Sequence, residues 1–190
     1  EESFSNNLLE KNKRRAGPIF GLQEEFETAN LENVVLDPYQ INFWERPENL
    51  NLYLDSKKKL LKFFKKEINL EDLFDIEKWS AYFALCDLLN THHGVLLKSV
   101  KFYYNPITQK FEPIAFDGHK LPAYDPSPII DELNLYDHRS LFLKSLFNEK
   151  NINDDNIDAK NFSDFLKLFF FNKNNKINEI FFQKYVQNLK

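Results

Sequence analysis

The sequence predicts an α+β fold that is mostly helical and contains one β-hairpin. Three observations lead to this prediction. Apolar residues recur at three- and four-residue steps between positions 76 and 89, as on one face of an amphipathic helix. Residues 99–116 hold two strand-like runs separated by turn signals at Asn105-Pro106 and Thr108-Gln109. Two further helical patterns, at residues 162–171 and 177–189, predict a closing antiparallel helix pair.

The first half of the chain predicts short elements between irregular stretches. Residues 5–15 predict a helix, and residues 19–22 predict a strand. Residues 24–50 lack clean periodicity and contain Asp-Pro and Arg-Pro pairs, so we expect a loop there. Asp55 is the expected N-cap of a helix that runs to Lys66. A turn at residues 70–74 then leads into the helix that follows Asp75.

The second half places polar segments around the hairpin. A short loop, Asn90-Thr91-His92-His93-Gly94, joins the amphipathic helix to it, and Asp117-Gly118 follows its second strand. Three prolines in residues 118–128 argue against regular structure there, and the Asn/Asp-rich residues 148–160 predict a surface loop.

The composition of the chain indicates which classes of protein it could belong to. The chain has 190 residues, 43% of them hydrophobic, including 20 Phe, which is enough for a packed aromatic core in one domain with room for a second small lobe. Its net charge of −4 gives no basic footprint for nucleic acid. No apolar run is long enough to cross a membrane. Because the chain contains no Met and opens and closes on element-like sequence, we expect both ends to continue in a parent protein.

Asp117 is the first candidate functional residue. It follows Pro113-Ile-Ala-Phe116, a run that is apolar on both faces and predicts a strand with little solvent access. A carboxylate held at the exit of such a strand suits a hard cation such as Mg²⁺. Gly118 would let the backbone turn sharply beside it. Alternatively, Asp-Gly is simply a common turn pair.

Four other residues are candidates because of their position around Asp117. His92 and His93 could orient a hydroxyl, accept a proton or bind a metal, or they could be groups that cap a helix C-terminus. Ser99 is a candidate second metal ligand, and Lys98 could contact phosphate. A zinc site built from His92, His93, Asp117 and His119 is conceivable, although no recognised zinc-binding spacing supports it.

Several segments of the chain resemble the spore-coat CotH kinase-like family, a group of atypical protein kinases. The similar segments are 74–89, 102–106 and 110–117, in which a helix, a polar loop and a hairpin that ends in an acid follow the order of a kinase catalytic loop and metal-binding aspartate. Residues 8–20 and the closing Phe181, Tyr185 and Leu189 also look like the family.

The resemblance implies a kinase-like two-lobe fold and a metal-dependent phosphotransferase. Residues 51–190 would form the C-lobe and residues 1–50 the tail of an N-lobe, whose ATP-gripping strands would lie upstream of Glu1. The implied cofactors are Mg²⁺ or Mn²⁺ with ATP, and the implied partner is a protein whose hydroxyl accepts phosphate. Asp117 and Ser99 would hold the metal, Lys98 would contact the nucleotide, and His93 with His92 would take the catalytic role. Family members are often exported or coat-associated in bacteria.

The chain departs from the family pattern at three places. Thr91-His-His-Gly94 occupies the place of the catalytic-loop acid, Lys98-Ser99 replaces a His-Asn pair, and Gly21 stands where some members have lysine. Two alternatives therefore stay open: a catalytically inactive kinase-like binding or scaffold protein, and a metal-dependent hydrolase that uses the histidines and Asp117. The sequence does not predict the acceptor or the oligomeric state.

Overall fold

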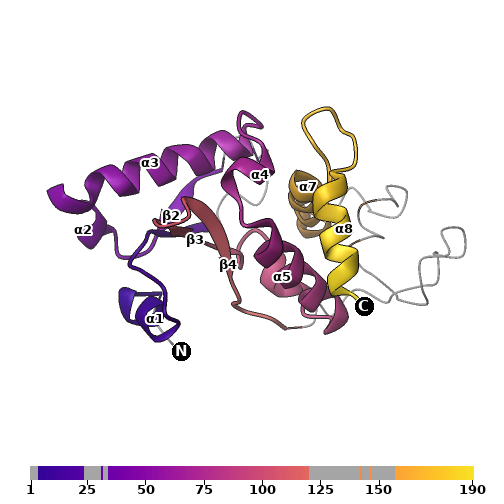
Figure 1. Cartoon of the computed structure of the whole chain (residues 1–190), viewed down its shortest axis with the longest axis horizontal. Coiled ribbons are helices and arrows are strands. Elements are labelled where there is room, and N and C mark those ends of the chain that lie inside the picture. Colours follow the sequence, from indigo (N-terminus) through magenta and orange to yellow (C-terminus); the bar gives the residue numbers. More distant parts are fainter. Residues whose placement is uncertain (1–3, 24–30, 32–33, 120–141, 143–145, 147–156) are drawn as a thin grey trace, which may run out of the picture.

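The fold is α+β, as the sequence predicts. The computed structural model describes residues 4–23, 31, 34–119, 142, 146 and 157–190, with side chains for residues 157–162 left aside. In this part of the chain, helices pack around a four-stranded antiparallel sheet with strand order β2-β1-β3-β4 (Figure 1). The strands are β1 (Ile19–Leu22), β2 (Leu36–Pro38), β3 (Lys101–Asn105) and β4 (Lys110–Ile114).

Helical elements lie before, between and after the strands along the chain. They are α1 (Asn6–Lys11), α2 (Ile41–Trp44), α3 (Pro47–Phe64), α4 (Leu70–Leu73), α5 (Ile76–Leu88), the 3₁₀ turn η3 (His92–Val95), α7 (Ile157–Phe170) and α8 (Glu179–Asn188). Helices α7 and α8 lie side by side, joined by a loop that an isolated bridge between Phe171 and Ile177 closes (Figure 1). No helix in the described part of the chain is both long and apolar enough to cross a bilayer.

The two faces of the sheet are buried in different ways. Successive strand residues point to opposite faces, so Phe20 and its partner Phe102 enter the main core, whereas Ile19 and its partner Tyr103 face the other way. The main core is formed with α3, α5, α7 and α8, and the smaller cluster is formed with Leu9 of α1. The sheet is therefore a middle layer between α1 and the larger helical part.

Aromatic side chains fill the main core. Trp79 of α5 is fully buried and lies between Phe102 of β3 and Phe169 of α7, with ring centroids 5.4 and 4.9 Å away. Its indole Nε1 donates a hydrogen bond of 3.0 Å to the carbonyl of Phe111 in β4. Trp79 thus connects α5 both to the hairpin and to α7.

Several predicted elements are confirmed. The strand at residues 19–22 has the predicted bounds, and the predicted helix 76–89 is α5, capped by Asp75, whose side chain accepts a hydrogen bond from the backbone of Lys78. The hairpin turn is closed by a bond of 2.8 Å from the backbone of Gln109 to the carbonyl of Asn105. The two closing helices are also present, with somewhat different bounds.

The interpretation of residues 24–50 as a loop is wrong where the structure describes them. This region contains β2, α2 and the first turn of α3. Helix α3 begins at Pro47, since proline suits the first position of a helix, where its missing N–H is not needed. Asp55 is consequently not an N-cap; it lies inside α3 and pairs with Lys59 one turn later.

Two further boundaries differ from the prediction. Helix α1 ends at Lys11 rather than Arg15, because Lys13 adopts a left-handed conformation with φ of 56°. Helix α7 begins at Ile157, inside the segment predicted as a surface loop. Residues 120–128, part of the segment in which prolines argue against regular structure, and residues 148–156 lie outside the described part of the chain.

The predicted division at residue 50 is not tested by the structure. Strands β1 and β2, from the predicted N-lobe tail, belong to the same sheet as β3 and β4.

Candidate functional site

The candidate site lies where β4 ends and the chain passes η3. Strand β4 ends at Ile114, and Ala115 is already exposed, so the prediction of a buried strand up to Phe116 is wrong. Asp117 itself takes the turn, with a φ of 54°, whereas Gly118 has no positive φ. Aspartate tolerates this left-handed conformation better than most residues do. The turn aims the carboxylate back at η3.

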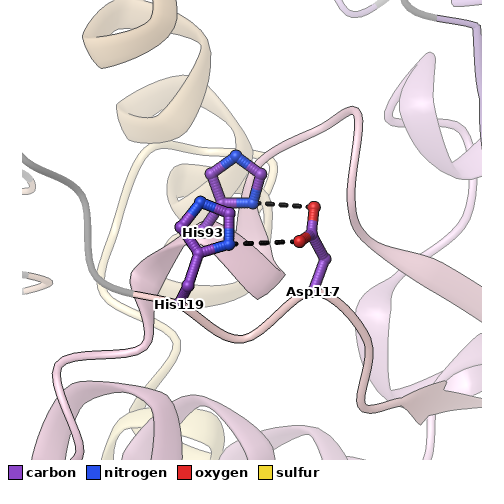
Figure 2. A group of neighbouring side chains, drawn as sticks. All are labelled: His93, Asp117 and His119. Atoms are coloured by element: carbon purple, nitrogen blue, oxygen red, sulfur yellow. Dashed lines mark hydrogen bonds and ion pairs between the residues drawn. The ribbon is translucent and has the colours of Figure 1, made fainter.

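Asp117 binds an imidazole with each carboxylate oxygen. Its Oδ2 lies 2.9 Å from Nδ1 of His93, and its Oδ1 lies 3.1 Å from Nδ1 of His119. The two rings stack on one another with centroids 3.8 Å apart, and Figure 2 shows both Nδ1 atoms facing the carboxylate. The three residues form the one group of potential metal ligands found among the residues that the structure describes.

Ser99 contacts both Asp117 and His93 with its hydroxyl. It is 2% exposed, and its hydroxyl lies 2.9 Å from Oδ2 of Asp117 and 3.1 Å from Nδ1 of His93. Because this buried hydroxyl contacts both side chains, it orients the Asp117 carboxylate and the His93 ring. The structure thus brings together three residues predicted from the sequence, Asp117, His93 and Ser99.

The environment of Asp117 favours its ionised form. Partial burial alone would raise the pKa of this carboxyl, but the hydrogen bond from Ser99 and the charges of His93 and His119 outweigh that effect and hold the pKa below its usual value. The side chain is 34% exposed, and that of His119 is 58% exposed. The carboxylate is therefore ionised and accessible at neutral pH.

The turn carrying His93 is fixed by close packing. A Cβ added to Gly94 would lie 2.8 Å from the carbonyl oxygen of Phe116 and 2.8 Å from the hydroxyl of Tyr82. That hydroxyl also donates a hydrogen bond of 2.8 Å to the carbonyl of Gly94. Only glycine lets η3 approach the end of the hairpin this closely.

The other two predicted residues lie outside this cluster. His92 is buried, and its Nε2 lies 3.2 Å from Oδ1 of Asp87 instead of facing Asp117. Lys98 is half-buried, and its carbonyl accepts a bond of 3.0 Å from Nζ of Lys101. The described residues provide no hydrogen bond or ion pair to the side chain of Lys98, and its proposed contact with phosphate stays a prediction.

His119 takes the place that the sequence analysis gave to His92. The sequence suggests His119 only as part of a zinc site, because nothing in the local pattern shows that its ring stacks on His93. Lys101, which the sequence analysis did not single out, is 4% exposed and lies with its ammonium 5.1 Å from the ring centroid of Phe116.

The donor atoms fit a divalent cation of the first transition row. One ligand atom from each of the three residues lies within 4.8 Å of the others, so the three could converge on one ion that replaces the hydrogen bonds between them. Two imidazole nitrogens and one carboxylate suit Mn²⁺, Fe²⁺ or Zn²⁺ better than Mg²⁺, which prefers oxygen ligands. To act as metal ligands, the imidazoles of His93 and His119 must be neutral.

Comparisons of the chain with models of protein families, with curated proteins and with solved structures find no match.

Proposed function

We propose that the chain is a divergent CotH-type, metal-dependent phosphotransferase that moves phosphate from ATP to a protein hydroxyl. The observation that carries this proposal is the ionised Asp117 at the end of the hairpin, bound at both oxygens by His93 and His119. In phosphoryl transfer the protein contributes mainly positioning and charge stabilisation, so a rigid metal-binding carboxylate is the central requirement.

The proposed roles follow from the positions of the side chains. Asp117, His93 and His119 would hold the ion, for which Mn²⁺ is the better fit of the two cations that the resemblance implies. A divalent cation there would neutralise charge on the phosphate oxygens during transfer. Ser99 would keep the Asp117 carboxylate and the His93 ring in place through its contacts with both. Because the exposed side of the site is formed by His119, the phosphate and its acceptor would approach from there.

The first experiment measures binding of Mn²⁺ to the chain by electron paramagnetic resonance, with and without ATP. One tight site is expected, and Asp117→Ala should abolish it. Asp55→Ala, which removes a carboxylate from the exposed face of α3, is the matched control and should bind as the wild type does. Absence of a tight Mn²⁺ site in the wild type would overturn the proposal.

A second candidate function is metal-dependent hydrolysis. The specific observation in its favour is the pair of imidazoles, since two histidines and one carboxylate are a ligand set of catalytic zinc sites. Radiolabelled ATP separates the two activities: label that moves to a serine-containing peptide supports transfer, whereas label released only as free phosphate supports hydrolysis. Metal and ATP binding with neither product would favour the inactive, kinase-like binding protein.

A further inference from the structure

Three polar side chains form a network inside the aromatic core, next to the candidate site. Asp87 of α5 is 7% exposed, His92 of η3 is 4% exposed and Tyr185 of α8 is fully buried. The hydroxyl of Tyr185 donates a hydrogen bond of 2.6 Å to Oδ2 of Asp87, and Nε2 of His92 lies 3.2 Å from Oδ1. The ring of Phe142 packs against both His92 and Tyr185.

This network joins three elements that are distant in the sequence. A buried carboxylate is costly unless its oxygens are bonded, and here each oxygen has a partner from a different element. Such a network defines the orientation of all its members, because a shift of one leaves a buried polar atom without its bond. The side chain of Asp87 in α5 thereby links helix α8 to the 3₁₀ turn.

The direction of His92 sets the direction of His93. With three residues per turn, successive side chains of a 3₁₀ helix leave its axis about 120° apart. His92 points into the core toward Asp87, and the next residue, His93, lies against Ser99 and Asp117. Holding His92 inward therefore holds the His93 ring at the candidate site.

We propose that Tyr185, Asp87 and His92 are positioning residues, through which the C-terminal helix α8 keeps His93 against Asp117. This inference rests on the proposed metal site for its functional meaning. None of the three residues touches the ion or the substrate; they act through the backbone between His92 and His93.

The test compares Tyr185→Phe with Asn188→Ala. The first variant removes the hydroxyl that bonds Asp87, and the second removes another hydrogen bond between α8 and α5, from Asn188 to the hydroxyl of Ser80 at 3.2 Å. Both loosen α8, but only the first loosens the network. Co²⁺, whose visible absorption reports its coordination, is the metal probe.

We expect Tyr185→Phe to weaken Co²⁺ binding about tenfold, the size of effect seen when groups behind a metal ligand are removed. Its Co²⁺ spectrum should also change, whereas Asn188→Ala should keep both the affinity and the spectrum of the wild type. If the wild type binds Co²⁺, equal affinity and identical spectra in Tyr185→Phe would overturn the inference.

A metal-free measurement separates this inference from the proposed function. In the wild type, proton cross-peaks between the stacked rings of His93 and His119 are expected in NMR spectra. Their loss in Tyr185→Phe, but not in Asn188→Ala, supports positioning even in a protein that binds no Co²⁺, in which case only the metal site is wrong. Unchanged cross-peaks overturn the positioning role.

His92 provides a second pair of variants should Tyr185→Phe fail to fold. Gln at position 92 keeps a side-chain N–H that can reach Asp87, whereas Leu keeps the bulk alone. His92→Gln should preserve the cross-peaks and Co²⁺ affinity, and His92→Leu should lose both. Cross-peaks and Co²⁺ affinity preserved in both variants would show that volume, not the bond to Asp87, orients His93, and would overturn the inference.

Discussion

The α-carbon of Gly94 faces the carbonyl oxygen of Phe116 so closely that a Cβ there would lie 2.8 Å from it. This approach brings η3 against the end of the hairpin and lets His93 reach Asp117. Both the atom on Phe116 and the nearby hydroxyl of Tyr82 are held, the first by the backbone and the second by a hydrogen bond to Gly94 itself.

Gly94→Ala should therefore separate η3 from the hairpin. We expect a loss of about 1–3 kcal/mol in the free energy of unfolding, since backbone must shift to admit the methyl group. Urea denaturation measures this change, and Mn²⁺ titration of the folded variant should show weaker binding. Gly118→Ala is the matched control: its Cβ would meet Thr91 at an ordinary 3.5 Å, so stability should change by no more than about 0.5 kcal/mol. Equal effects of the two changes would contradict this account.

Ser99→Ala should raise the pKa of Asp117 toward its usual value. The hydrogen bond from the Ser99 hydroxyl is the largest of the influences that lower this pKa. Titration of the Asp117 carboxyl carbon by NMR measures the shift, and stability should fall by about 1 kcal/mol. Ser56→Ala removes another buried hydroxyl, which bonds the carbonyl of Tyr53 within α3. That control should lower stability without moving the Asp117 titration.

The stability of the protein should depend on the ionisation of Asp117 in acid. Because the folded state lowers the pKa of this group, the folded state favours the ionised form, and its contribution is fully present above the unfolded pKa of about 3.9. The contribution is lost as the pH falls from there through the lowered pKa. Asp117→Asn should thus show a smaller loss of stability than the wild type over that range. Parallel stability curves for the two proteins would rule out this linkage.

Glu112→Gln should be among the costlier single-charge changes. Glu112 is 2% exposed and lies 3.0 Å from both Arg14 and Lys78, and it accepts a bond of 2.7 Å from Asn105. Removing the charge takes the Glu112 carboxylate from Arg14 and leaves Lys78 paired with Asp75 alone, so we expect a loss of about 2 kcal/mol. Asp55→Asn, which breaks the exposed pair with Lys59, should cost no more than about 0.5 kcal/mol. Thermal or urea unfolding of the two variants checks the difference.

Local signals determined much of the secondary structure. The apolar stripe of α5, the Asn-Pro turn of the hairpin and the strand after Gly17-Pro18 each depend on residues close together in sequence, and each was predicted close to its observed bounds. The short elements β2 and α2 were missed, because β2 has three residues and is defined by pairing with β1 rather than by a pattern of its own.

The same difference between local signals and tertiary contacts applies to the residues of the candidate site. Asp117, His93 and Ser99 could be proposed from the sequence because they follow the boundaries of predicted elements. His92 and His119 could not be told apart there, since both are histidines in polar loops.

The sequence by itself determined the α+β class, the hairpin and the position of an acid at its end. Only the tertiary structure decided which histidine turns toward that acid and which one is buried against Asp87. The physical reason is that a side chain's direction in a loop depends on contacts with distant elements. Here those contacts are the Gly94–Phe116 approach and the hydroxyl of Tyr185, which lies 98 residues from Asp87 along the chain.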